Sequence, residues 1–242
     1  RLVGSEMCIR DRSGWVLGGV FVVGISCWFL LKKRNREFAL ASIKIGAIFG
    51  LVSSLLAVWT GDGSGYQIAQ TQPMKLAAVE GLYEGGTNVG LVGIGMLNPE
   101  KKTYNDGKDP FLFRIEIPSM LSFLAERDVD GYVPGITNII EGGYQLKDGT
   151  TALSAAEKIE RGKTAIGALA AYRAAKSAGH EEDAAVAYQV LQENMPYFGY
   201  GYIKDVNQLV PNVPLNFYAF RIMVILGGYF ILFFIVCLLY TS

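Results

Sequence analysis

This 242-residue chain has little histidine and cysteine and no net charge. It has one histidine, His180, and three cysteines, Cys8, Cys27 and Cys237, which lie far apart and form no CxxC pair. A disulfide framework, a zinc site or a histidine-rich metal site is therefore not expected. The 22 Lys and Arg residues balance the 22 Asp and Glu residues, so no excess of positive charge points to a nucleic-acid partner.

What the chain does have is three long apolar runs. Hydrophobic residues make up 51% of it and charged residues 18%, and their concentration in blocks is typical of a membrane protein. Gly14–Leu31 contains 18 residues without a charge; as a helix it would be about 27 Å long, close to a hydrocarbon core of roughly 30 Å. Further runs cover residues 38–59 and 217–236. The sequence therefore predicts three transmembrane helices.

The charges between these runs predict how the chain crosses the membrane. The first two runs are joined by Lys32–Arg36, KKRNR, which the positive-inside rule places in the cytoplasm. Residues 61–214 carry 19 Asp and Glu against 13 Lys and Arg, a net charge of −6. We expect an all-α membrane protein: a transmembrane hairpin at 13–60, a large, mostly helical extracytoplasmic loop at 61–215, and a third transmembrane helix at 216–237.

The polar loop opens with the segment Gly61–Gly81, GDGSGYQIAQTQPMKLAAVEG. Asp62 and Ser64 are residue types that start helices, and a helix is expected from Gln67 to Leu82 with a kink at Pro73, which removes a backbone donor. Lys75 and Glu80 combine a cation and a carboxylate. Residues five apart on a helix point about 140° apart, so the two are not expected to form a simple ion pair. Taken alone, they are most simply a solvated surface.

This segment resembles the start of the quinol-binding loop in subunit I of cytochrome bd-type ubiquinol oxidases, with its GD-x-SG start followed by Q-x-x-K-x-A-A-x-E. The resemblance implies that Gln72, Lys75 and Glu80 bind quinol and that Lys75 and Glu80 are catalytic. The chemistry agrees, because quinol oxidation releases two protons and two electrons. A carboxylate can accept a proton, and an ammonium can polarise the developing carbonyl.

A second family signature begins the last apolar run, where residues 218–223 read YAFRIM. The resemblance implies that Met223 is an axial ligand of a low-spin b-type haem; a neutral thioether raises the haem potential. Arg221 needs a partner inside a span, either a haem propionate, which we favour, or lipid headgroups.

The rest of the loop carries weaker signals. Gly85–Gly95 is glycine-rich and is expected to be a flexible loop. Phe111–Leu124 is apolar and is expected to pack on the membrane surface; its Glu116 is either a further substrate-binding residue or a structural carboxylate. Two helices are expected at 152–178 and 181–193, with His180 on the surface at the turn between them.

The ends of the sequence and the missing haem ligands point to a fragment. Residues 1–12 and 238–242 resemble sequencing read-through and are expected to be non-native. In the family the opposing haem ligand is a histidine just upstream of Ser13, where this sequence has none. The low-spin haem b site is thus partial, and haem d and a second b-type haem are expected only in the complete protein.

The resemblance implies a terminal quinol oxidase in the bacterial cytoplasmic (inner) membrane, with a second oxidase subunit and the lipid bilayer as partners. It would oxidise ubiquinol or menaquinol at the outer face, for oxygen reduction to water in the complete complex, and the fragment alone is expected to be inactive. The alternative is a membrane-anchored extracytoplasmic sensor or ligand-binding module without redox activity.

Overall fold

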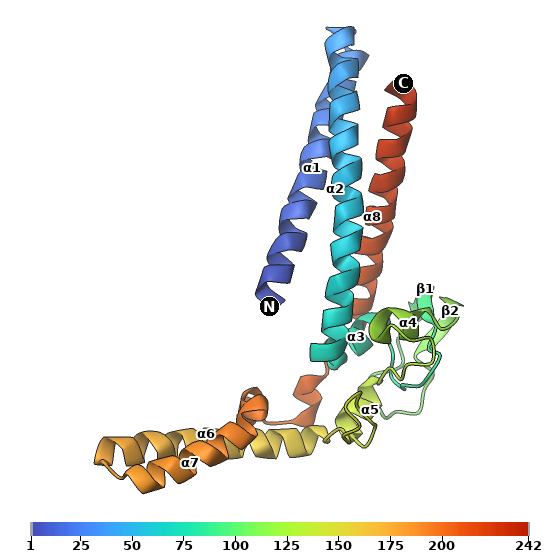
Figure 1. Cartoon of the computed structure of the whole chain (residues 1–242). Helices are drawn as coiled ribbons and strands as arrows, with labels where there is room; N and C mark the ends of the chain where they lie inside the picture. Colours follow the sequence, from blue (N-terminus) through green and yellow to red (C-terminus); the bar gives the residue numbers. More distant parts are fainter. Residues whose placement is uncertain (1, 242) are drawn as a thin grey trace.

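Three long helices form a bundle in the computed structural model, which describes residues 2–241 and, for side-chain surroundings, residues 10–241 (Figure 1). They are α1 (Leu2–Leu31), α2 (Arg36–Thr71) and α8 (Val213–Thr241). All three are long and apolar enough to cross a membrane, and most of their large apolar side chains are exposed, as lipid-facing surfaces require. The three predicted spans and the mostly helical fold are confirmed.

Glycines allow these helices to approach one another closely. A Cβ on Gly50 of α2 would overlap the ring of Phe234 on α8, and a Cβ on Gly19 of α1 would lie 2.9 Å from the Cα of Gly50. Phe234 is fully buried. Close contact through small residues is a common way for membrane helices to associate, so Gly50 marks the point where all three helices meet.

α2 continues well beyond the predicted end of the second span. It runs without a break to Thr71, so the expectation that Asp62 and Ser64 start a new helix is wrong. Asp62 instead accepts a hydrogen bond from Arg127, with Nη2 2.5 Å from Oδ2, and this tertiary contact helps to hold a glycine-rich turn in the helix. The predicted interruption at Pro73 is confirmed, because α3 starts at that residue after a non-helical Gln72.

The remaining elements all lie at the end of the bundle away from the Lys32–Arg36 connection (Figure 1). In chain order they are α3 (Pro73–Glu80), β1 (Leu91–Leu97), β2 (Phe111–Ile117), α4 (Met120–Glu126), α5 (Ile136–Glu141), α6 (Ala155–Ala178), α7 (Glu181–Asn194), η1 (Met195–Tyr202) and η2 (Val206–Leu209). The basic connection and the acidic segment are therefore at opposite ends, as the charge pattern predicts.

A two-stranded antiparallel sheet is the main departure from the sequence prediction. β1 includes the second half of what was expected to be a flexible glycine loop, from Leu91 to Gly95, and it pairs with β2, which was expected only to be apolar surface. The glycines at 93 and 95 hide the strand signal of the branched residues around them, and a register shift between Val92 and Ile94 takes up one of them.

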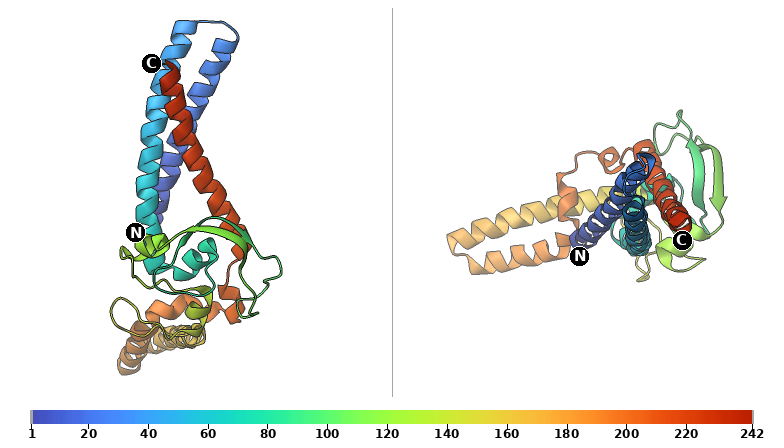
Figure 2. Two further views of the ribbon diagram at one scale, coloured as in Figure 1. Left: turned by 90° about the vertical axis from the view of Figure 1, so that its right-hand side faces the viewer. Right: turned by 90° about the horizontal axis from the view of Figure 1, so that it is seen from above.

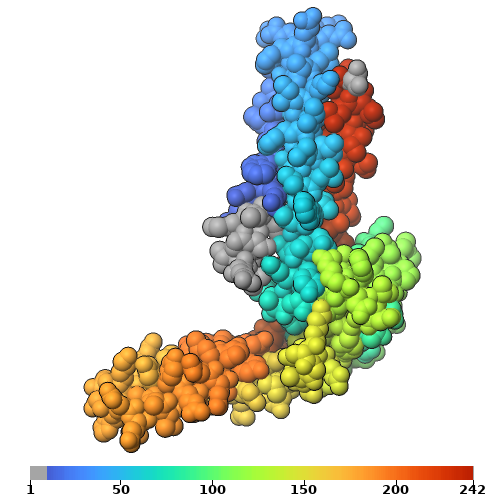
Figure 3. Space-filling view, in the orientation of Figure 1, coloured from blue at the N-terminus to red at the C-terminus, as the bar shows by residue number. Residues whose placement is uncertain are grey.

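α6 and α7 form a helical arm that projects sideways from the bundle (Figures 2 and 3). Both predicted helices are confirmed. Ser154 starts α6 with a reciprocal capping box to Glu157, and Gly179 ends it with φ +77°. His180 is exposed at the start of α7, at the turn between the two helices.

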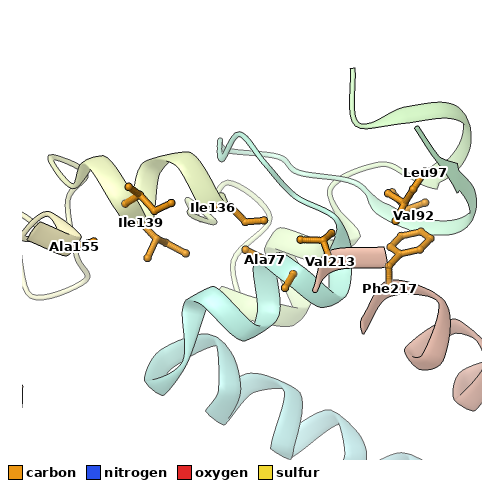
Figure 4. Close-up of a cluster of buried hydrophobic side chains, with 10 residues drawn as sticks. Ala77, Val92, Leu97, Ile136, Ile139, Ala155, Val213 and Phe217 are labelled. Atoms are coloured by element: carbon orange, nitrogen blue, oxygen red, sulfur yellow. The ribbon is translucent and has the colours of Figure 1, made fainter. Parts of the chain in front are cut away.

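One apolar cluster joins these elements to the bundle (Figure 4). It brings together α3, β1, α5, the start of α6 and the first turns of α8. Its buried members are Ala77, Ala78, Val92, Leu97, Ile136, Ile139, Ile140, Ala155, Val213 and Phe217. The cluster fixes the end of α3 against α8, and this position determines the site described next.

Candidate functional site

The C-terminus of α3 places a carboxylate against α8. Pro73 is well suited to the first turn of the helix, where a missing N–H costs little. Gly81 ends it in a left-handed conformation, φ +65°, where a Cβ would lie 3.1 Å from Phe111 and 3.3 Å from Phe217. Glu80, the last helical residue, therefore lies in the narrow space between α3, β1 and α8, and only 4% of it is exposed.

Arg221 of α8 is the partner of this carboxylate. Its Nη2 lies 2.6 Å from Oε2 of Glu80, and its Nη1 lies 3.4 Å from Oε1. The same guanidinium donates to the carbonyl oxygens of Val79, at 2.9 Å, and Val92, at 2.7 Å. It also lies 4.2 Å from the centre of the Phe217 ring. Arg221 is 8% exposed, so one buried cation ties together α3, β1 and α8.

Burial and pairing act on Glu80 in opposite directions. Burial raises the pKa of Glu80, because a low-dielectric environment disfavours the charged form, while the hydrogen bond and charge of Arg221 oppose the rise. The net direction is upward. Two of the acceptors of Arg221 are carbonyl oxygens, so the guanidinium would remain hydrogen-bonded if Glu80 took up a proton. The arrangement therefore suits a carboxylate that is protonated and deprotonated in turn.

A cavity of about 660 Å³ borders Glu80. Its wall is formed by the end of α3, both strands and the turn between them. Its polar lining includes Glu80, Tyr83, Lys101, Tyr104, Asp109, Arg114 and Glu116. Because Glu80 is otherwise enclosed by protein, this cavity is where a ligand could meet its carboxylate.

The turn between the strands forms a rigid side of the cavity. Asp106 accepts hydrogen bonds from Lys101 Nζ at 2.8 Å and from the backbone N–H groups of Lys102, Thr103 and Lys108. These contacts, chiefly the one with Lys101, hold the pKa of Asp106 far below its ordinary value. Lys101 also lies 4.6 Å from the centre of the Tyr83 ring. These contacts hold the turn in a defined shape.

The other predicted site residues lie apart from the pair. Gln72 and Lys75 are exposed, and within the described residues Lys75 makes no ion pair. It occupies a different face of α3 from Glu80 and does not line the cavity. Glu116 does line the cavity, at its exposed side, where it pairs with Arg114 at 3.4 Å.

Comparison with known proteins identifies the family. The sequence profile of cytochrome bd terminal oxidase subunit I matches residues 8–241. The chain belongs to this family. It is 31% identical over 243 residues to cytochrome bd-II ubiquinol oxidase subunit 1 of Escherichia coli (strain K12), covering 95% of this chain and 43% of that protein.

Other similarities to bd oxidases are shorter or more distant. Cytochrome bd ubiquinol oxidase subunit 1 of Bacillus subtilis (strain 168) is 31% identical over 124 residues, 50% of this chain and 25% of that protein. The bd oxidase structure from Geobacillus thermodenitrificans is similar with a TM-score of 0.49 and 18% identity, over 98% of this chain and 56% of that one. The chain thus spans less than half the length of the curated relatives it matches.

Haem cofactors are characteristic of the bd oxidase family, and the described residues fit one side of a haem. Met223 follows Arg221 by two residues, so it points about 200° around α8 from the ion pair. It is 58% exposed and offers an accessible thioether. The single histidine, His180, lies on the helical arm, away from α8 (Figure 1). Among the described residues, Met223 therefore offers an accessible thioether on α8, and the histidine lies on a different element.

The Glu80–Arg221 pair was missed by reasoning from sequence. A charge inside a span does signal a buried partner, but a haem propionate and lipid headgroups were the partners expected. The two residues belong to different segments at opposite ends of the polar loop, and only the fold shows that these ends meet. Lys101 was also missed. Its side chain is buried, but a turn rich in lysine is typical of a solvated surface.

Proposed function

We propose that the chain is the quinol-oxidising part of a bd-type terminal oxidase subunit, acting on ubiquinol or menaquinol at the outer face of the bacterial cytoplasmic membrane. The observation that carries the proposal is the buried Glu80, which is held by Arg221 and borders a cavity at the outer end of a membrane bundle. In this orientation Lys32–Arg36 is cytoplasmic and residues 61–215 are extracytoplasmic.

Glu80 is the proton acceptor in this proposal. Quinol oxidation releases two protons and two electrons, and a carboxylate with a raised pKa is well matched to take one of these protons. Arg221 is a positioning residue, because it orients the carboxylate and keeps two carbonyl partners when Glu80 is neutral. Glu116 is assigned as a secondary contact for the substrate, and its position on the exposed side of the same cavity supports this role.

Lys75 and Gln72 act from outside the cavity. Their exposed positions suit attraction and orientation of the quinol headgroup or polarisation of its oxygen from the other side of α3. A low-spin b-type haem, with Met223 as one ligand, would supply the electron acceptor. The expected contact between Arg221 and a haem propionate is replaced by its pairing with Glu80. Oxygen reduction belongs to the complete complex with its second subunit, its haem d and its second b-type haem.

Steady-state quinol kinetics of the complete oxidase test this proposal. Glu80→Gln is expected to lower kcat at least 100-fold, since general-base catalysis typically contributes about 10²–10⁴. Lys75→Ala is expected to act mainly on KM. Glu193→Gln, an exposed carboxylate on α7 far from the cavity, is the control and should leave both constants unchanged. Unchanged kcat in Glu80→Gln, with normal haem content, would reject the assignment.

A further inference from the structure

The two faces of the β1–β2 hairpin differ in chemistry. On one face the cross-strand pairs are Leu91–Ile117, Ile94–Ile115 and Met96–Phe113; on the other they are Val92–Glu116, Gly95–Arg114 and, after a second register shift, Leu97–Phe111. The bulge between Val92 and Ile94 keeps both faces uniform. The second face contributes Val92, Arg114 and Glu116 to the cavity at Glu80. The first face is wholly apolar and turns away from it.

Beyond Leu91, which packs against the cluster around Leu121, this apolar face lacks cover in the described part of the chain. Ile94 is 63% exposed, and Met96, Phe113, Ile115 and Ile117 are each at least half exposed. A contiguous apolar patch of this kind marks an interaction site rather than an ordinary water-exposed surface. Something apolar must cover it.

Hydrogen bonds fix the height of the hairpin relative to the bundle. The free edge of β1 is bonded to α8, with Leu97 N–H donating to Tyr218 Oη at 3.0 Å and Arg221 donating to the Val92 carbonyl at 2.7 Å. Tyr218 and Arg221 follow the start of the apolar run at Phe217 by one and four residues. At 1.5 Å per residue, β1 is therefore attached about 2–6 Å inside the point where α8 enters its apolar stretch.

The hairpin lies beside the bundle, not beneath it. Seen from above, it is outside the three long helices (Figure 2), and from the side it is level with their outer ends (Figures 1 and 2). Its position continues the exposed apolar surface of α8 outward, where the nearest apolar phase is the outer leaflet of the membrane.

We propose that the apolar face of the β1–β2 hairpin is a membrane-contact surface, seated in the interfacial region of the outer leaflet with its side chains directed into the lipid. The sheet limits the depth: within residues 2–241 it has two strands, so the outer edge of β2 has no neighbouring strand to pair its backbone groups. Such an edge is not tolerated in the hydrocarbon core. The backbone thus lies at headgroup level, and the side chains reach the acyl chains.

The hairpin then forms a thin wall between lipid and the Glu80 cavity. Lipid contacts one face, and the cavity lies against the other, so a headgroup leaving the bilayer need pass only the edge of this wall to reach the carboxylate. This consequence rests on the proposed function, whereas the lipid contact does not.

Spin-label accessibility measures the lipid contact directly. Single cysteines are introduced at positions 113–117, one at a time, into the complete oxidase after its own cysteines, Cys27 and Cys237 included, are replaced with serine, and the oxidase is reconstituted into phosphatidylcholine nanodiscs. Oxygen concentrates in lipid and a nickel chelate stays in water. We expect labels at 113, 115 and 117 to be accessible to oxygen and protected from nickel, and labels at 114 and 116 to show the reverse. A label replacing Tyr188 on the exposed arm is the aqueous reference.

The outcomes distinguish lipid, water and protein as the material that covers the apolar face. Nickel accessibility at 113, 115 and 117 equal to that at 188 would show water there and overturn the proposal. Low accessibility of these positions to both reagents would show a protein cover, such as the second subunit, and would overturn it equally. Neither result depends on quinol turnover, so failure of the lipid contact is distinguishable from failure of Glu80 as a proton acceptor.

Discussion

Arg221 and Glu80 are separated by 141 residues in the sequence and by 2.6 Å in the structure. Arg221 lies in the third turn of the last long helix, α8, and Glu80 ends α3, so their contact joins the two ends of the polar loop. The guanidinium also bonds the Val79 and Val92 carbonyls. The pair is therefore a structural junction as well as part of the candidate site, and the two roles predict different mutant behaviour.

Loss of Arg221 is expected to be more damaging than loss of charge at Glu80. Arg221→Met leaves a buried carboxylate without its cation, a change that typically costs about 3–5 kcal/mol. Glu80→Gln leaves Arg221 bonded to two carbonyls and is expected to cost about 1–2 kcal/mol. Thermal unfolding of the detergent-solubilised protein measures the difference.

The double variant Arg221→Met/Glu80→Gln provides the check on this prediction. It should be more stable than Arg221→Met alone, because it removes the stranded charge. Arg114→Met, which breaks an exposed pair with Glu116, is the control and should cost less than about 1 kcal/mol. If the double variant is no more stable than Arg221→Met, the carboxylate is not charged in the folded protein.

The raised pKa of Glu80 predicts an acid limb in the activity profile. Only the ionised carboxylate can accept a proton, so kcat should fall as pH drops through its pKa, which lies above the ordinary value of about 4.3. The limb should therefore appear at a higher pH than for an exposed glutamate. The stability contribution has the opposite sense: a raised pKa stabilises the fold at low pH, and this contribution is lost as pH rises.

A pH series on quinol turnover from about pH 5 to 8 measures this limb. Glu80→Asp should keep it with an altered midpoint, and Glu80→Gln should abolish it along with most of the rate. A residual activity in Glu80→Gln that retains the same acid limb would show that another group accepts the proton.

The local elements of this fold follow from the sequence more readily than their meeting points. The three spans, the break at Pro73 and the two helices of the arm are all predictable, because each depends on composition or on a capping residue within a few positions. The strand β1 is not, because its glycines disguise it and its partner lies beyond a turn of 13 residues, 98–110. The partner of Arg221 cannot be predicted from neighbouring residues, because Glu80 lies 141 residues away in the sequence.

The candidate site was predictable only in part. Glu80 and Arg221 were each singled out, and helix geometry already separated Lys75 from Glu80. The pairing of Glu80 with Arg221 and the cavity depend on how α3 packs against α8. The aliphatic contacts that set this packing are spread over five elements, and nothing in any one element specifies them.

Met223 is predicted to bind haem iron through its thioether. Met223→Leu preserves the apolar character and size of an exposed position on α8, so any effect on folding should be small. The dithionite-reduced minus oxidised spectrum of the complete oxidase should lose or shift its low-spin b-type band. Ile222→Leu, at the neighbouring and equally exposed position, is the control. A wild-type spectrum in Met223→Leu would exclude ligation by this residue.

Asp106 is predicted to hold the turn at 98–109 in shape. Its lowered pKa means that its contribution to stability is present above the ordinary Asp pKa of about 3.9 and is lost as pH falls toward the lowered value. At neutral pH the contacts with Lys101 and three backbone N–H groups are intact. Asp106→Asn should increase hydrogen exchange of the Lys102, Thr103 and Lys108 amides, which now lack a charged acceptor.

The neighbouring Asp109→Asn is the control for this measurement, because its carboxylate makes no hydrogen bond in the described structure. Exchange in the turn should remain at the wild-type rate. Equal protection in both variants would mean that the shape of the turn depends on its backbone alone and not on Asp106.

Gly50 tests whether the three long helices pack as the structure places them. A methyl group on Gly50 would overlap the Phe234 ring, so Gly50→Ala must push α8 away from α2 and is expected to cost about 1–3 kcal/mol. Gly61→Ala, on the same helix but with open space around its Cβ, should be neutral or stabilising by up to about 1 kcal/mol, because alanine favours a helix.

Phe234→Ala combined with Gly50→Ala should relieve the overlap, so the two substitutions should cost less together than the sum of their separate effects in thermal unfolding. Additive costs would mean that α8 does not contact α2 at Gly50, because residues in contact are expected to couple.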